Sequence, residues 1–227
     1  INSSAGSPYV MWYWKAGGAA VSNTDGTITS QVSADVDAGF SIVKWTGNNL
    51  AGKTIGHGLS STPELYIIKR TSAALAWQVN LSSLVTGTEG YLLLDRTLSM
   101  YTTFPNYYTS ANNTVLSTNG TSTAERQYNN QSANYIAYCF HSVAGYSKIG
   151  SYTGTGATGN NIVTGFEPAW VIIKSTSSTG TAWNMWDNKR TPYDMLRANT
   201  SDSEFSGPGR ITFSTTGFQL LDNDASR

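Results

Sequence analysis

Short apolar stretches alternate along the chain with segments rich in Gly, Asn, Ser and Thr. Apolar stretches bounded by turn-forming residues are typical of β-strands, and these are too short for helices of ordinary length. Asp25-Gly26 is a strong signal for a turn between two strands. The predicted strands are Tyr9–Trp14, Thr27–Ser33, Phe40–Trp45, Leu65–Arg70, Ala76–Val79, Thr114–Thr118, Tyr135–Phe140, Ser147–Tyr152, Trp170–Lys174, Trp183–Trp186, Arg210–Ser214 and Phe218–Leu221.

The pattern predicts no amphipathic helix of ordinary length. Tyr91–Asp95 could be a strand or a short helical turn, and Tyr193–Arg197 could be one helical turn. We expect an all-β protein of two tandem antiparallel β-sandwiches, of the jelly-roll or lectin-like kind. The alternative is a single β-assembly that extends across both halves. In the first sandwich, we expect Phe40–Trp45 to pair with Leu65–Arg70, and residues 99–114 to form a long surface loop.

A long stretch of the sequence occurs twice. Residues Gly39–Lys69 match residues Gly145–Lys174, with matched positions 105 to 107 residues apart, and a Trp follows each copy at a similar interval, at Trp77 and Trp183. A repeat of this length indicates duplicated domains rather than a short solenoid unit.

The repeat leaves one strand unmatched. Tyr9–Trp14 resembles Tyr135–Phe140, and we interpret both as the closing strand of a repeat, covered on both faces. The chain then divides into residues 1–38, the closing strand of a preceding repeat plus a linker; residues 39–141, the first sandwich; and residues 142–227, the second, without its last strand. Either the ends mark where a fragment was cut, or the first strand completes the second sandwich of another chain by strand addition.

The charge content argues against two classes of partner. Charged residues make up only 12% of the 227 residues, with 14 basic and 14 acidic side chains that cancel. Nucleic-acid binding needs clustered basic charge, so we expect no nucleic-acid partner. No apolar run approaches the roughly 20 residues of a membrane span, so we expect no membrane insertion. A surface built from Ser, Thr, Asn and Gly suits close packing against neighbouring subunits.

No constellation of residues predicts a reaction. His57 lies in a Gly-flanked turn that has no His in the second copy, so a structural role is favoured, and a site shared with His141 would be an accident of folding. Cys139, the single cysteine, reads as a small core side chain. Asp222-Asn223-Asp224 is better explained as a turn than as a cation site. No paired-carboxylate pattern of a glycosidase occurs. We expect no catalytic residues, no metal and no cofactor.

Aromatic side chains are the remaining candidates for binding, because sugars are commonly held against exposed Trp and Tyr rings. Tyr101, Tyr107 and Tyr108 fall in the predicted loop, where burial is less obligatory. Trp183 and Trp186 should face opposite sides of their strand, so one of them should be exposed or at an interface. Tyr101, Tyr107, Tyr108 and Trp186 are therefore candidate carbohydrate-binding residues. Packing of these rings against a neighbouring subunit is an equally good explanation.

A series of motifs runs through residues 9–69, and its members are Tyr9–Gly18, Val21–Ile28, Ala38–Val43, His57-Gly58-Leu59, Pro63 and Ile67-Ile68-Lys69. This series resembles tail and other structural proteins of tailed bacteriophages, especially cyanophages, and the half that begins at Gly145 is similar to the same family. The resemblance implies a virion protein with concanavalin-like β-sandwiches, often assigned to tail fibres or host contact. It implies no catalytic residues.

These observations favour a non-enzymatic structural protein of a phage virion, part of a tail fibre, spike or appendage that attaches to the host surface. Its expected partners are other virion subunits, including copies of itself, and a host glycan or receptor. One alternative is a purely architectural subunit of a filament or capsid decoration, joined through Tyr9–Trp14 (Tyr9, Val10, Met11, Trp12, Tyr13 and Trp14). Another is a depolymerase of surface polysaccharide.

Overall fold

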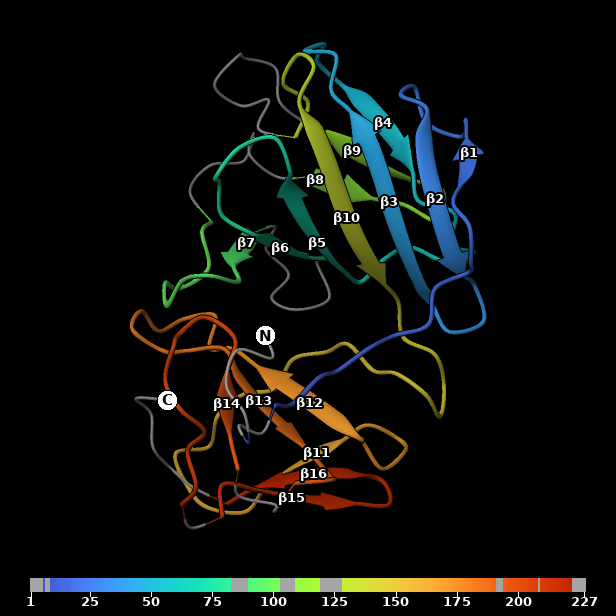
Figure 1. Ribbon diagram of the computed structural model, residues 1–227. Coiled ribbons are helices and arrows are strands. Elements are labelled where there is room, and N and C mark those ends of the chain that lie inside the picture. Colours follow the sequence, from blue (N-terminus) through green and yellow to red (C-terminus); the bar gives the residue numbers. More distant parts are fainter. Residues whose placement is uncertain are drawn as a thin grey trace.

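The computed structural model describes residue 6 and residues 9–82, 90–102, 109–118, 128–190, 194–207 and 209–221. Across these ranges the protein is all-β, with no helix and four open antiparallel sheets (Figure 1). The sheets form two bodies, which we call the first half (residues 19–141) and the second half (residues 142–221). The expected all-β class is therefore confirmed.

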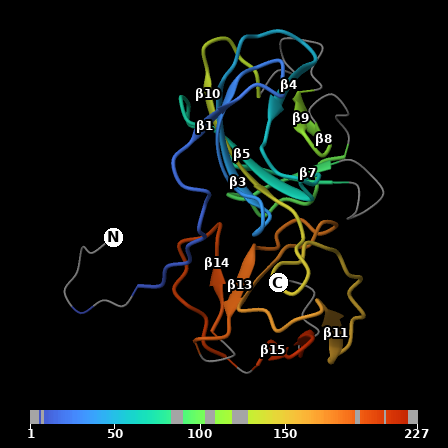
Figure 2. The ribbon, with the colours of Figure 1, turned by 90° about the vertical axis from the view of Figure 1, so that its right-hand side faces the viewer.

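The first half is organised on a seven-stranded sheet with the order β1-β2-β3-β10-β5-β6-β7. A three-stranded sheet, β4-β9-β8, packs across it and encloses the main core (Figure 2). The strands are β1 (Val21–Asn23), β2 (Ser30–Asp35), β3 (Phe40–Thr46), β4 (Lys53–Gly56), β5 (Leu65–Arg70), β6 (Gln78–Leu81), β7 (Gly90–Leu93), β8 (Thr109–Ala111), β9 (Val115–Thr118) and β10 (Asn134–Phe140).

Strand β10 lies at the centre of the large sheet and pairs along its whole length with β3, and over most of it with β5. The expected direct pairing of Phe40–Trp45 with Leu65–Arg70 is therefore wrong, because β10 lies between them. The apolar composition of β10 on both faces suits this central position, since a central strand has neighbours at both edges and cover on both faces.

The core side of this sheet is filled by alternate side chains of β10 and its neighbours. Tyr135 stacks on Trp45 at 5.2 Å between ring centroids, and the Trp45 indole N–H donates to the Tyr128 carbonyl. Ala137 and Cys139 are fully buried beside them. Burial raises the pKa of the Cys139 thiol to about 12, so it stays protonated and unreactive. This confirms the structural role expected for the single cysteine.

The second half contains two three-stranded sheets, β12-β13-β14 and β11-β16-β15. Their facing sides enclose a smaller core around Trp186, Met195, Ile211 and Phe218. The strands are β11 (Asn160–Val163), β12 (Trp170–Ile173), β13 (Asn184–Asp187), β14 (Leu196–Arg197), β15 (Ile211–Ser214) and β16 (Gly217–Leu220).

Strand order and register in the second half match those of the first. The order β5-β6-β7 corresponds to β12-β13-β14, and β4-β9-β8 corresponds to β11-β16-β15. Leu65 lies opposite Leu81 in one half, and their sequence-matched residues Trp170 and Asp187 lie opposite each other in the second. The second half differs in the rest of that sheet: no described strand takes the place of β1, β2, β3 or β10, and β12 is therefore an edge strand.

Several expected elements differ from those found. Ser147–Tyr152 is not a strand and is largely exposed, because no described strand pairs with it. The predicted strand Thr27–Ser33 corresponds to β2, which lies between β1 and β3 in the sheet. Its Ser30 and Ser33 hydroxyls are buried and donate to the Gly56 and Gly18 carbonyls. The pattern also missed the short polar strands β1, β4, β8 and β11. Of the possible helical turn at Tyr193–Arg197, the described part contains β14 instead.

Trp183 joins the two halves. Its ring packs against Val79 and Leu92 of the first half, and its indole N–H donates to the Leu93 carbonyl at 2.9 Å. Backbone hydrogen bonds from Met100 to the Thr176 carbonyl and from Gly180 to the Thr97 carbonyl lie at the same joint. The two halves therefore share an apolar cluster rather than a loose linker.

Replacing Trp183 tests this joint. We expect Trp183→Ala to lower the free energy of unfolding by about 3–5 kcal/mol, because it empties a buried site. Trp183→Phe keeps much of the apolar contact and removes one of the two donors to the Leu93 carbonyl, which keeps the Arg96 N–H, so it should cost about 0.5–1.5 kcal/mol. Equilibrium unfolding in urea measures both. A Trp183→Ala protein as stable as the parent would contradict the role of the joint.

Candidate assembly and binding site

The structure does not gather the predicted carbohydrate-binding residues into one site. Trp186 is only 5% exposed and lies inside the core of the second half, so its ring faces are unavailable to a sugar, and the prediction for it is wrong. It sits on the core side of β13, whereas Trp183, just before β13, faces the joint. The two rings face different sides, as expected, but both are buried, Trp183 at the joint between the two halves of the same chain.

Tyr101 is partly buried and stacks on Tyr91, with 4.9 Å between ring centroids and 13° between ring planes. One face of its ring is therefore already occupied. Tyr107 and Tyr108 lie outside the described residues, so their candidacy stays a prediction.

The segment Tyr9–Trp14, here called the N-terminal segment, is the most exposed aromatic stretch of the described chain. It forms no strand, and Met11 and Tyr13 are 75% and 82% exposed. The expectation that both of its faces are covered is therefore wrong. The segment leaves the first half beside β2 and passes over the second half near β12 (Figure 1).

Trp12 and Trp14 attach the N-terminal segment to both halves. Trp14 contacts Trp170 of β12 at 5.3 Å between ring centroids, with the planes at 78°, and also lies 6.5 Å from Phe140 of β10. Trp12 lies 6.5 Å from Trp170. Phe140 in turn packs on Phe40 at 4.8 Å. We call these five rings the aromatic seam; edge-on contacts of this kind are favourable between aromatic rings.

Arg190 adds a cation to the seam. Its guanidinium lies 5.8 Å from the centre of the Trp12 ring and is held by ion pairs to Asp187 and Glu204. Burial alone would raise the pKa of the Asp187 carboxyl, but the hydrogen bonds it accepts from Arg190 and from the Lys189 backbone outweigh burial and hold that pKa below its usual value. The guanidinium is thus fixed in place as a platform for Trp12.

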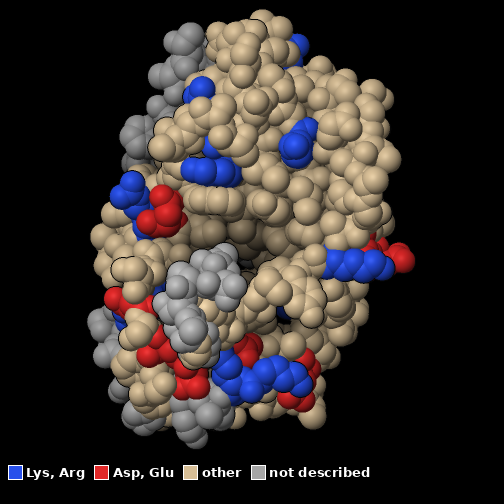
Figure 3. Space-filling model, in the orientation of Figure 1, with Lys and Arg blue, Asp and Glu red and all other residues tan. Residues whose placement is uncertain are grey.

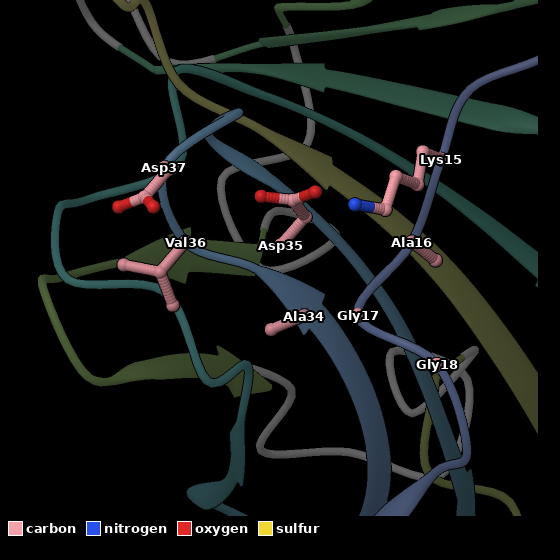
Figure 4. Close-up of a pocket in the computed structure, with 8 residues that line it drawn as sticks. All are labelled: Lys15, Ala16, Gly17, Gly18, Ala34, Asp35, Val36 and Asp37. Atoms are coloured by element: carbon pink, nitrogen blue, oxygen red, sulfur yellow. The ribbon is translucent and has the colours of Figure 1, made fainter.

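Gly17 and Gly18 fasten the N-terminal segment to the first half. The Ser33 hydroxyl donates to the Gly18 carbonyl at 2.7 Å, and a Cβ at Gly17 would lie 1.8 Å from the Ala34 carbonyl oxygen. A pocket is left beside this contact, lined by Lys15, Ala16, Gly17, Gly18, Ala34, Asp35, Val36 and Asp37 (Figure 4). Lys15 and Asp35 point towards each other across it, and Asp37 points away.

The edge of β12 beside the seam exposes backbone groups. The Asn188 N–H donates to the Ala169 carbonyl, so the backbone groups of Ala169 face β13. Because these groups alternate in direction along a strand, those of Trp170 and Ile172 face the opposite, open edge. Among the described residues, neither makes a backbone hydrogen bond on that side.

His57 is a structural residue. It is fully buried, its Nδ1 accepts from the Leu59 N–H, and its Nε2 therefore carries the proton and donates to the Asn112 carbonyl at 3.0 Å. The ring ties the turn after β4 to the turn between β8 and β9. The structural role expected from the sequence is met.

The described residues offer little else for chemistry. No group of three or more His, Cys, Asp or Glu side chains in the described ranges could hold a metal ion. No helix in those ranges is long and apolar enough to cross a membrane. The face shown in Figure 3 carries few charged side chains, which are scattered over the first half and mixed in sign over the second.

Comparison with known proteins identifies the family of the chain. The whole chain, residues 1–227, matches the model of a family described as a domain of unknown function, DUF7483. The chain belongs to the DUF7483 family. No curated protein and no solved structure matches it.

The sequence pointed to part of this site. Its repeat singled out Tyr9–Trp14 as an unmatched strand, but nothing in it indicated that Trp170 and Arg190 would form the surface beneath. A usable signal was present, since Trp170 stands where the first copy has Leu65. An aromatic ring in place of a Leu side chain at the matched position indicates a different neighbour in the second half.

Gly17 is the position to test for the attachment of the N-terminal segment. We expect Gly17→Ala to lower the free energy of unfolding by about 1–3 kcal/mol and to speed protease cleavage within residues 9–16, because the added methyl group collides with the Ala34 carbonyl. Gly150→Ala is the matched control, since a Cβ there meets nothing within 4 Å. Equal behaviour of the two variants would show that the contact at Gly17 is not needed.

His57 predicts a pH dependence of stability. Burial lowers its pKa below the ordinary 6.5, so between the two values the unfolded chain binds more protons than the folded one. The contribution of the neutral His57 ring to the free energy of unfolding should therefore be fully present above about pH 6.5. It should be lost as the pH falls from there through the lowered pKa. Urea unfolding at pH 7.5 and 5.5 measures this, and the His57→Gln variant should lose that part of the slope. An unchanged slope in the variant would assign the effect to other groups.

Proposed function

We propose that this DUF7483 protein is a non-enzymatic structural protein of a bacteriophage virion, part of a tail fibre, spike or other appendage that contacts the host surface. In this proposal residues 39–141 and 142–227 are two tandem β-sandwich repeats, preceded by a strand and linker in residues 1–38. The division into two repeats is supported by one observation: strands β5-β6-β7 and strands β12-β13-β14 pair in the same register.

The rigid connection between the halves supports a structural role. Trp183 and its hydrogen bond to Leu93 bury the joint, and the aromatic seam adds a second connection along the N-terminal segment. Extended appendages need repeated modules whose relative position is fixed, and a buried joint fixes it better than a flexible linker does. The virion assignment itself comes from the resemblance of residues 9–69 to phage tail proteins.

An enzymatic role has less support. A glycosidase needs two carboxyl groups free to face the scissile bond. Asp187 and Glu204 both form ion pairs with the Arg190 guanidinium, so neither is free to face a substrate. The depolymerase alternative therefore has no candidate carboxyl pair among these residues.

Attachment through a glycan depends on residues other than Trp186, because Trp186 is buried, and one face of the Tyr101 ring is already taken by Tyr91. The sparsely charged surface suits sugar hydroxyls, so a host glycan or protein receptor remains the proposed partner at the host (Figure 3).

Particle labelling tests the structural role. An antibody raised against the purified protein should label an appendage of intact phage particles in immunogold electron microscopy, at a fixed position on each particle. Particles purified to constant composition that carry no label, although the protein is made during infection, would contradict the proposal.

Competition tests the attachment role separately. Host cells incubated with the purified protein should adsorb fewer phage particles, because the protein occupies the receptor. Denatured protein at the same concentration is the control. Labelled particles together with unchanged adsorption would leave an architectural subunit and exclude the attachment role.

A further inference from the structure

Among the described residues, no strand fills one position in the second half that β10 fills in the first. In the first half, Phe140 of β10 lies opposite Phe40 on one side and Leu65 on the other. The sequence-matched residues in the second half are Tyr146 and Trp170. No described strand pairs with both, Tyr146 is 57% exposed, and Tyr146–Tyr152 forms no strand.

The open edge of β12 can hydrogen bond directly. The other side can do so once two local hydrogen bonds are released, because the Ser147 N–H now donates to the Val143 carbonyl and the Ile149 N–H to the Ser142 hydroxyl. The backbone groups of Trp170 and Ile172 face the open edge of β12. On the other side, Gly39 and His141 exchange a hydrogen bond in the first half, so alternate residues from Ser41 onwards face β10. Ser151, the match of Trp45, would direct its N–H to the vacant position in the same way.

The N-terminal segment fits this position by sequence and by contact. Tyr9–Trp14 aligns with Tyr135–Phe140, which makes Trp14 the match of Phe140. In the structure Trp14 contacts Trp170, the match of Leu65, so the side chains already meet in the register by which β10 pairs with β5.

The segment does not occupy the position in its own chain. In that register Met11 and Tyr13 match Ala137 and Cys139, which are fully buried on the core side of β10. Met11 and Tyr13 are instead 75% and 82% exposed, and Val10–Lys15 make no backbone hydrogen bond with β12. The attachment at Gly17 explains this, because only Lys15 and Ala16 separate Trp14 from the point where the chain is held against Ala34.

We propose that the vacant position between β12 and Tyr146–Tyr152 accepts the N-terminal segment of a second copy of this chain. A segment from another copy is held at its own Gly17, so it can pair with the open edge without the restraint that holds this chain's segment away. It takes the place of this chain's Trp12 and Trp14 rings, which must leave Trp170. The added strand would pair on both edges, turn Met11 and Tyr13 towards the core, and allow Tyr146–Tyr152 to become a strand.

Such a contact is head-to-tail, because the donor and acceptor are different surfaces. A contact of this type produces a linear filament unless the rotation between copies closes a ring. This inference rests on the proposed structural role and specifies how copies join. If the contact between copies does not form, the immunogold labelling of particles is unaffected. Failure of this inference can therefore be distinguished from failure of the proposed virion role.

Complementation between two full-length variants tests the contact. Trp12→Ala/Trp14→Ala removes the donor rings, and Trp170→Ala removes the acceptor ring. We expect the parent protein to associate as its concentration rises, each variant alone to stay monomeric, and their equimolar mixture to form a one-to-one dimer, since only one productive contact remains. Light scattering coupled to size exclusion measures the masses. Trp77→Ala, outside the seam, is the matched control and should associate like the parent.

A second acceptor variant guards against loss of folding in Trp170→Ala, which thermal unfolding would reveal. Ser151→Pro removes an N–H from the other side of the position, in an exposed segment outside every described strand, and should also be monomeric and form the dimer with the donor variant. Two results would overturn the proposal: a parent protein that stays monomeric over the whole concentration range, or a mixture of folded variants that forms no dimer.

Discussion

The need of a β-strand for partners at both edges is the constraint on which the rest of this structure depends. A buried strand cannot leave its N–H and C=O groups unpaired. In the first half, β10 meets this need for itself and for its neighbours β3 and β5. Cys139 and Ala137 can be fully buried there because the sheet is continuous around them.

In the second half, the strands that pair with one another form although no described strand takes the place of β10. Sheets β12-β13-β14 and β11-β16-β15 have the same order and register as their counterparts in the first half. The segment that would depend on the central strand, Tyr146–Tyr152, stays exposed and irregular. The antiparallel sheets of the second half therefore form wherever their own strand pairs are complete. The aromatic seam covers part of the open edge with rings instead of hydrogen bonds.

The sequence predicts the elements with strong apolar patterns and misses those without them. Buried runs such as Tyr135–Phe140 and Trp170–Lys174 are located correctly because their composition suits a strand in any surroundings. Asn160–Val163 is a polar strand held by its pairing with Gly217–Leu220, which no local pattern records. The predicted pairing of Phe40–Trp45 is wrong because β10 enters the sheet from a distant part of the chain.

The candidate site is predictable only in part, because it too depends on contacts between segments that lie far apart in the sequence. The repeat alone identifies Tyr9–Trp14 as an unmatched segment, although the structure forms no strand there. Its exposure is not evident from the repeat, because the attachment of Gly17 to Ala34 is a contact between backbones that leaves no trace in apolar periodicity. Trp186 resembles a binding residue in the sequence because its spacing from Trp183 fixes opposite directions but not which direction is solvent. Only the position of the other sheet decides that the Trp186 side is the core.

Amide hydrogen exchange at Trp170 and Ile172 tests most directly the claim that the edge of β12 accepts a strand from another copy. Exchange of these two amides should be fast in dilute protein and slow markedly as the concentration rises, while amides of β10 stay protected throughout. Slow exchange at every concentration would show that the chain's own segment pairs with β12. Fast exchange at every concentration would show that no strand fills the position in solution.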